Sequence, residues 1–239
     1  MVDFHTHILP KMDDGSRGTE ESLKMLKLCA SQGIDTVMLT SHYYAEQESP
    51  DEFLKRRKAS WERLQEAIGE SGETGFPELY PGAEVKLFYG ISGVEQLQRL
   101  DLAGTGFILL EMPFSEWSDK VFRELRSIIS QGMHPIIAHV ERYLKIQQNT
   151  DNIERLMDMD VLIQANAEFF LEGFFNKRRA LHMLQEGNIH LLGSDCHNLT
   201  SRPPNLGDAV QLIRGKLGED CIDRIVRRGH RILQNAQIE

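Results

Sequence analysis

Short apolar runs alternate with amphipathic stretches of helical period along the whole chain of 239 residues. Strands buried on both faces read as continuous apolar runs, and their alternation with helices is typical of parallel α/β folds. Neither a low-complexity segment nor an internal linker interrupts this pattern. We expect strands near residues 2–4, 36–40, 78–83, 107–110, 135–138, 161–165 and 190–193.

Several helix ends are readable in the sequence. Thr19 is the expected N-cap of the first helix, and Gly33 supplies its left-handed stop. Segment 49–52 (Ser-Pro-Asp-Glu) combines a capping box with proline at the first helical position. Residues 69–77 are expected to form a loop, because Gly, Ser, Thr and Pro crowd there. Further helices are expected near residues 118–130, 152–159, 176–185, 206–217 and 220–228.

About seven strands, each followed by a helix, predict a single α/β domain over residues 1–239 that forms a closed or nearly closed barrel. The length agrees, since one such barrel commonly occupies about 200 to 250 residues. A doubly wound open sheet is the alternative architecture. Both place functional groups at the carboxyl ends of the strands.

Composition narrows the classes of partner. The net charge of −9 argues against nucleic acid, because a phosphate backbone demands a basic surface. Three cysteines form no CxxC pair, which fits free thiols in a reducing compartment. The chain shows no leader-like start and no run approaching 18 apolar residues, so we expect a cytoplasmic protein without membrane insertion.

Histidines and carboxylates occur at six of the seven expected strand ends, and the strand that ends at Asn166 contributes none. Taken singly, each is more often a turn or surface residue, but their joint placement is not readily produced by chance. One catalytic ion uses about three protein ligands, so this set is too large for one ion. We predict a multinuclear metal centre of His5, His7, Asp14, His42, Glu84, Glu111, His139, Asp195 and His197.

Some members of this set are better supported than others. His5 and His7 are alternate residues of an extended segment and can therefore face the same ion. Asp13 and Asp14 precede a glycine in good turn chemistry, and the sequence does not decide which of them is the ligand. Glu111 has apolar neighbours on both sides, so it needs a buried partner, either a metal ion or a basic side chain.

Arg142 and Arg202 follow two of these strand ends, and a guanidinium group matches phosphate oxygens in a bidentate way. Cys196 and Arg202 also have the Cys-x5-Arg spacing of thiol-dependent phosphatases. Asp195 beside the thiol opposes a thiolate, and no glycine lies between Cys196 and Arg202 to let backbone amides close on a phosphate. We therefore expect Cys196 to be a bystander.

The successive motifs resemble those of the polymerase and histidinol phosphatase (PHP) superfamily. Within it, the opening and the Arg-Pro-Pro near the end look like the bacterial metal-dependent tyrosine-protein phosphatases of capsule and exopolysaccharide loci. The resemblance spans nearly the whole chain and rests on residues 5–10, 13–15, 40–42, 139–142, 194–197 and 202–204.

The resemblance implies a (β/α)7-type, distorted TIM-like barrel with about three divalent ions, usually Mn²⁺, although Fe or Zn would suit the same ligands. It implies the nine ligands named above, with Arg142 and Arg202 as phosphate binders. The implied substrate is a phosphotyrosyl protein, namely the tail of a membrane-associated bacterial tyrosine kinase. Two departures leave substrate preference open, since Val140 stands where proline is frequent and Tyr43 where a histidine or arginine often occurs.

His42 or His197 would protonate the leaving oxygen if not engaged by metal. Phe88, Tyr89, Phe114 and Trp117 follow two candidate ligands and either stack on a phenyl ring or simply pack.

A phosphatase of a small phosphomonoester such as histidinol phosphate would use the same centre. A regulator that binds a kinase tail without catalysis is the alternative of another class, and the intact ligand set argues against it.

Overall fold

The computed structural model describes residues 1–148, 150–234 and 236, so part of the expected domain 1–239 lies outside the described residues. Its strands are β1 (Val2–Thr6), β2 (Thr36–Leu39), β3 (His42–Tyr43), β4 (Glu78–Pro81), β5 (Glu84–Lys86), β6 (Phe107–Glu111), β7 (His134–Ile137), β8 (Leu162–Asn166) and β9 (Leu191–Gly193). Its α-helices are α1 (Thr19–Ser31), α2 (Pro50–Ser71), α3 (Asp119–Ser130), α4 (Glu141–Leu144), α5 (Asn152–Met157), α6 (Ala167–Leu171), α7 (Phe174–Gln185), α8 (Leu206–Leu217) and α9 (Glu219–Leu233). Two 3-10 helices span Ile91–Gly93 and Leu97–Leu100.

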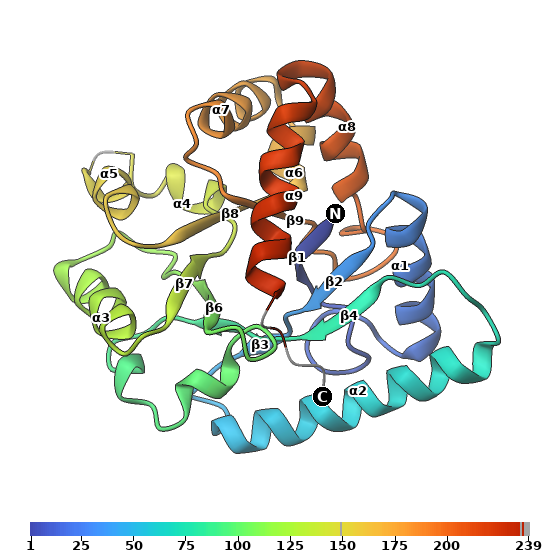
Figure 1. Ribbon diagram of the computed structural model, residues 1–239. Helices are drawn as coiled ribbons and strands as arrows, with labels where there is room; N and C mark the ends of the chain where they lie inside the picture. Colours follow the sequence, from blue (N-terminus) through green and yellow to red (C-terminus); the bar gives the residue numbers. More distant parts are fainter. Residues whose placement is uncertain (149, 235, 237–239) are drawn as a thin grey trace.

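The strands form a curled, parallel arrangement with helices around its outside (Figure 1). One sheet has the order β1-β2-β4, and the other has the order β3-β5-β6-β7-β8-β9. The segment after β9 lies beside β1, because His7 N donates to Cys196 O at 2.9 Å and Asp195 N donates to His5 O at 2.7 Å. The fold is therefore a mixed α/β fold in which both sheets contribute to one curved set of strands.

The seven predicted strands are all present, and β3 and β5 are two additional ones. The chain leaves the first sheet after Leu39 and after Pro81, and it then pairs in the second sheet with His42 opposite Glu84. These two residues therefore begin strands, whereas the sequence predicted that they follow strand ends. Strands of two or three residues are too short to produce a periodic pattern, which is why the sequence did not reveal them.

The helix ends were predicted with mixed success. The capping box of α2 is confirmed, with Glu52 accepting from Ser49 N at 2.9 Å, and Gly33 has the expected positive φ of 77°. Thr19 is wrong as an N-cap, because Gly18 occupies that position and Thr19 is the first helical residue. The predicted loop 69–77 is also partly wrong, since α2 continues to Ser71 and ends at left-handed Gly72.

Two hydrophobic clusters lie on opposite faces of the strands. Val37 and Leu39 of β2 belong to the larger cluster, which packs against the outer helices, whereas Met38 between them belongs to the smaller one. The smaller cluster includes Ile232 of α9, a helix that crosses in front of the strands in Figure 1. A Cβ on Gly229 of α9 would lie 3.0 Å from the Phe4 ring, so α9 packs closely on β1.

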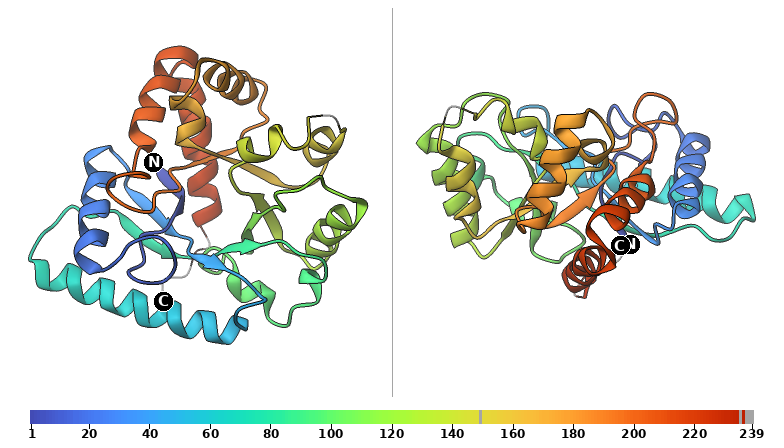
Figure 2. Two further views of the ribbon diagram at one scale, coloured as in Figure 1. Left: turned by 180° about the vertical axis from the view of Figure 1, so that it is seen from behind. Right: turned by 90° about the horizontal axis from the view of Figure 1, so that it is seen from above.

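The face that carries the smaller cluster becomes polar toward the carboxyl ends of the strands. Leu109 of β6 belongs to this cluster and Leu162 of β8 packs against it, and Glu111 and Gln164 lie two residues further along the same strands. Side chains two residues apart in a strand share a face. The apolar layer therefore supports the polar groups, and Figure 2 shows the strands from the opposite side.

The structure also bears on the cysteines and on the question of a membrane-spanning helix. The three cysteines are free, as expected, and the structure buries all three. Within the described ranges, no helix combines the length and apolar character needed to cross a bilayer.

We predict that Gly193→Ala destabilises the protein by about 1–3 kcal/mol, the usual effect of overpacking. A Cβ on Gly193 would lie 2.6 Å from His5 Cβ and 2.8 Å from Gln164 Nε2. Chemical denaturation measures the change. Gly215→Ala is the control, because Gly215 lies in α8 with nothing within 4 Å, and it should be neutral or stabilising by up to about 1 kcal/mol. Equal stability of the two variants would contradict the close approach of β9 to β1.

Candidate metal centre

The nine predicted ligands lie together, with His42 and Glu84 at the starts of the short strands β3 and β5 and the others near the carboxyl ends of strands or in the loop after β1. Seven of them form three overlapping groups whose ligand atoms lie within 4.8 Å of one another. The other two contact the same groups, since His139 Nε2 lies 2.8 Å from Glu84 Oε1 and Asp195 Oδ1 lies 3.4 Å from His7 Nε2. The groups are His7, Asp14, His42 and His197; His5, His7 and Glu84; and His42, Glu84 and Glu111.

His5 of β1 and His7, the residue that follows β1, direct their Nε2 atoms toward each other. His7 Nδ1 lies 2.7 Å from Asp13 Oδ2, and His5 Nδ1 lies 3.3 Å from Gln164 Oε1. Both acceptors are oxygens, so both Nδ1 atoms carry a proton, and each Nε2 presents a lone pair when its ring is neutral. Against the effect of burial, Glu84 raises the pKa of His5 and Asp13 raises the pKa of His7, so a proton on Nε2 is the alternative to a metal ion at this place. These Nε2 atoms are only 3.2 Å apart. Two facing lone pairs repel unless a cation binds them, and this arrangement fits a metal ion.

His197 also carries its proton on Nδ1 and leaves Nε2 free. Its Nδ1 donates to the backbone oxygen of Asp195 at 2.9 Å, and its buried Nε2 has no hydrogen-bond partner among the described residues. Burial and the neighbouring His7 lower the pKa of His197 to about 4, so the ring is neutral near pH 7. A neutral imidazole suits a metal ligand better than a general acid.

Glu84 lies at the centre of the group. Its Oε2 is 2.9 Å from His42 Nδ1 and 3.1 Å from His5 Nε2, yet it makes no hydrogen bond of acceptable geometry in the described structure. Glu111 is also buried, and burial followed by the charge of Glu84 raises its pKa. The two carboxylates differ, because burial opposes ionisation of both, but His5 and the other neighbouring histidines hold the pKa of Glu84 well below its usual range, whereas Glu111 lacks such compensation.

Asp195 joins the ligand cluster to the two arginines. Its Oδ1 faces His7, while its Oδ2 accepts from Arg202 Nη2 at 2.6 Å and from Arg142. The arginine side chains remain about one-third exposed, at 33% and 36%. Asp195 thus contacts both the imidazoles of the cluster and the two guanidinium groups, and the four carboxylates of the cluster provide the oxygen ligands that divalent cations accept.

Two of the candidate ligands have a strained backbone. His139 has φ of 34° and Asp195 has φ of 53°, in the left-handed region that non-glycine residues seldom adopt. Such a conformation costs on the order of 1–3 kcal/mol and concentrates at functional sites. It is held here by buried hydrogen bonds, from His139 N to Gln164 Oε1 at 2.7 Å and from Asp195 N to His5 O at 2.7 Å.

Sequence reasoning missed the polar residues of β8. Gln164 positions His5 and His139, and its amide nitrogen donates to Asn166 at 2.9 Å. Asn166, which is absent from the predicted set, in turn donates to Asp195 Oδ2 at 2.9 Å. The available signal was a glutamine inside the apolar run 161–165, where a buried amide must find hydrogen-bond partners.

The two aspartates of the 13–15 turn have different positions. Asp13 contacts His7 Nδ1 and accepts from His42 N at 2.9 Å, so it orients these two histidines. Asp14 Oδ1 lies 3.4 Å from His197 Nε2 and 3.5 Å from His42 Nε2. This geometry favours Asp14 as the ligand.

Cys196 is fully buried, and burial together with Cys29 raises its pKa well above the usual thiol value. A buried neutral thiol is a poor nucleophile. The structure therefore supports the expectation that Cys196 does not attack phosphate.

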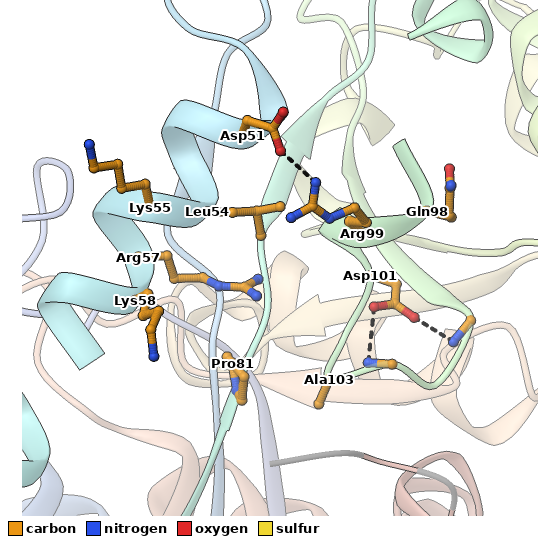
Figure 3. Close-up of a pocket in the computed structure, with 12 residues that line it drawn as sticks. Asp51, Leu54, Lys55, Arg57, Lys58, Pro81, Gln98, Arg99, Asp101 and Ala103 are labelled. Carbon is orange, nitrogen blue, oxygen red and sulfur yellow. Dashed lines mark hydrogen bonds and ion pairs between the residues drawn. The ribbon is translucent and has the colours of Figure 1, made fainter. Parts of the chain in front are cut away.

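Two cavities differ in their relation to the centre. One of about 570 Å³ lies directly beside it and is lined by Asp14, His42 and Tyr44 among others. Another of about 740 Å³ lies between α2 and the segment 101–106 (Figure 3). None of the nine candidate ligands lines the second cavity, so it is separate from the centre.

Comparison with known proteins agrees with this geometry. The sequence matches the family described as capsular polysaccharide synthesis, CpsB/CapC, over residues 1–234. The chain belongs to the CpsB/CapC family. It is 30% identical over 235 residues to tyrosine-protein phosphatase CpsB of Streptococcus pneumoniae, covering 91% of each chain. It is 27% identical to tyrosine-protein phosphatase YwqE of Bacillus subtilis, covering 100% of this chain and 93% of that protein.

A solved structure supports the same assignment. It comes from the crystal structures of YwqE from Bacillus subtilis and CpsB from Streptococcus pneumoniae, described as metal-dependent tyrosine phosphatases. The TM-score is 0.84 at 25% sequence identity, and the match covers 100% of this chain and 96% of that chain.

We predict that Asp13→Asn and Asp14→Asn have different effects on metal binding. Asp13→Asn should weaken Mn²⁺ affinity about 10- to 100-fold at unchanged stoichiometry, because His7 loses the charged acceptor that orients it. Asp14→Asn should lower the number of ions bound at saturation. Calorimetric titration and elemental analysis measure both quantities. Full stoichiometry in Asp14→Asn, with an ion lost from Asp13→Asn, would exchange the two roles.

Proposed function

We propose that this protein is a metal-dependent protein-tyrosine phosphatase that acts in capsule or exopolysaccharide synthesis. The observation that carries the proposal is the cluster of facing imidazole and carboxylate lone pairs beside two guanidinium groups. Relatives named as tyrosine-protein phosphatases match over nearly the whole chain and add the substrate class. The reaction is the hydrolysis of a phosphate monoester to the free phenol and inorganic phosphate.

The donor set fits divalent cations, because imidazole nitrogens and carboxylate oxygens converge on the same place within 4.8 Å of one another. We assign about three ions, Mn²⁺ by preference, with Fe or Zn compatible with mixed nitrogen and oxygen ligands. When bound, such ions supply Lewis acidity and an activated water as nucleophile. The holding residues are His5, His7, Asp14, His42, Glu84, Glu111, His139, Asp195 and His197.

Arg142 and Arg202 bind and orient the phosphate in this proposal. Their guanidinium groups converge on Asp195 Oδ2 beside the cluster, so both can reach oxygens of a phosphate placed there. Protonation of the leaving oxygen is assigned to His42 or His197, and the neutral state of His197 favours His42. This step contributes less than for an alkyl ester, because tyrosine has a pKa of about 10 and its phenolate leaves more readily.

The finer features of the protein are part of the same proposal. We infer one domain in which the strands close as a (β/α)7 barrel, with β2 and β3 counted as one barrel strand and β4 and β5 as another. The partner is proposed to be the phosphorylated tail of a membrane-associated bacterial tyrosine kinase, met in the cytoplasm. Turnover of phosphotyrosyl peptides compared with that of histidinol phosphate separates this function from that of a small-molecule phosphatase.

We predict that chelation abolishes hydrolysis of a phosphotyrosyl peptide and that Mn²⁺ restores it better than other divalent ions. The reason is that the residues of the cluster present lone pairs and carboxylates but supply no strong nucleophile of their own. Phosphate release is measured before and after metal removal, with metal content determined on the same samples. Full activity of metal-free protein would refute the proposal.

Arg142→Ala and Arg202→Ala should each keep their bound metal and lose about 1.5–3 kcal/mol in kcat/KM, the contribution of a charged hydrogen bond. Arg214→Ala serves as a control, because Arg214 pairs with Glu219 on the surface and should leave both quantities unchanged. Steady-state kinetics and elemental analysis report them. An unchanged kcat/KM, or loss of metal, in either site variant would count against phosphate binding.

A further inference from the structure

Phe114 is an exposed aromatic residue that lies against a candidate metal ligand. Its side chain is 53% exposed, and its ring stacks on His139 with centroids 6.1 Å apart and planes at 19°. Phe114 follows Glu111 of the cluster by three residues. An apolar ring in this place is open to solvent on one side and meets the centre on the other.

Buried aromatic residues support the ring of Phe114. Its ring lies 5.5 Å from that of Tyr143, which in turn lies 5.3 Å from that of Trp117. Tyr143 Oη accepts from Met112 N at 2.9 Å, and Trp117 Nε1 donates to Pro113 O at 3.0 Å. These bonds hold the backbone just before Phe114, and Gln147 Nε2 holds the backbone just after it by donating to Ser115 O at 2.7 Å. The ring of Phe114 is therefore presented with little freedom to lose on binding.

A second aromatic residue also stacks on a candidate metal ligand. Tyr44 stacks on His42 with centroids 5.2 Å apart and planes at 22°, and it lines the cavity of about 570 Å³. His42 and His139 both contact Glu84. The two rings therefore stack on histidines that share one central carboxylate.

The other aromatic residues fit this role less well. Trp117 is only 3% exposed and is part of the support. Tyr89 is 70% exposed, but its ring is covered by Lys120 Nζ at 5.0 Å. Phe174 and Phe175 are exposed on α7, where their rings contact each other at 5.6 Å.

We infer that Phe114 binds the phenyl ring of the substrate and gives the centre its preference for aryl over alkyl phosphates. This inference rests on the proposed function, since it concerns the leaving group of the same reaction. A phosphate bound at the cluster holds its ester-linked ring close by, within reach of the exposed face of Phe114. An offset-stacked aromatic pair contributes about three- to tenfold in affinity.

The test compares two phosphonate inhibitors, whose phosphorus–carbon bond is not hydrolysed. Phenylphosphonate and methylphosphonate are titrated calorimetrically into manganese-loaded protein, and the ratio of their Kd values measures the contribution of the ring. Phe114→Ala should lower the preference for phenylphosphonate about three- to tenfold and leave methylphosphonate binding unchanged. Phe114→Trp should retain the preference. Phe175→Ala is the matched control for an exposed phenylalanine and should behave as the unaltered protein.

Phe114→Leu keeps most of the apolar volume and guards against misfolding of the alanine variant, and it should also lower the preference. An unchanged preference in both variants overturns the inference. If the unaltered protein nevertheless hydrolyses phosphotyrosyl peptides, the proposed function stands without it. Loss of the preference in a protein that hydrolyses no phosphotyrosyl peptide would refute the function and keep the ring contact.

Discussion

The facing lone pairs of His5 and His7 are the constraint on which the rest of the site depends. Asp13 and Gln164 fix the protons of these rings on the far nitrogens, which leaves the near nitrogens 3.2 Å apart. Such an arrangement has a high electrostatic energy in a buried place unless a cation is bound. Removing either fixing residue would let a ring change its tautomer and relieve the repulsion, at the expense of the binding geometry.

The fold accommodates this concentration of charged groups because it separates them from the apolar interior along the same strands. The smaller hydrophobic cluster includes Leu109 of β6 and Ile232 of α9, and the polar Glu111 lies two residues beyond Leu109 on the same strand. Gly193 permits β9 to approach β1 closely enough for the backbone to join their ends. Rigid packing of the apolar layer therefore sets the spacing of the polar side chains further along the strands, which is the condition for precise metal coordination.

Much of this arrangement could be predicted from the sequence, because parallel strands bring their carboxyl ends to one place. Residues at strand ends, such as Glu111 and His139, were therefore identified from their position alone. The conformations of His139 and Asp195 could not be predicted, since a positive φ leaves no composition signal outside glycine. The role of Gln164 depends on hydrogen bonds to residues 159 and 25 positions away in the chain, which no local pattern records.

Asp195 has a consequence for turnover that follows from its two oxygens. Because Oδ2 pairs with Arg142 and Arg202, a phosphate bound by these arginines, as in the proposed function, would compete with an anion of the protein itself for both guanidinium groups. The arginines would exchange one partner for another, which cancels part of their attraction. The same exchange applies to the substrate and to inorganic phosphate, so Asp195 would ease release of the product and thereby limit product inhibition.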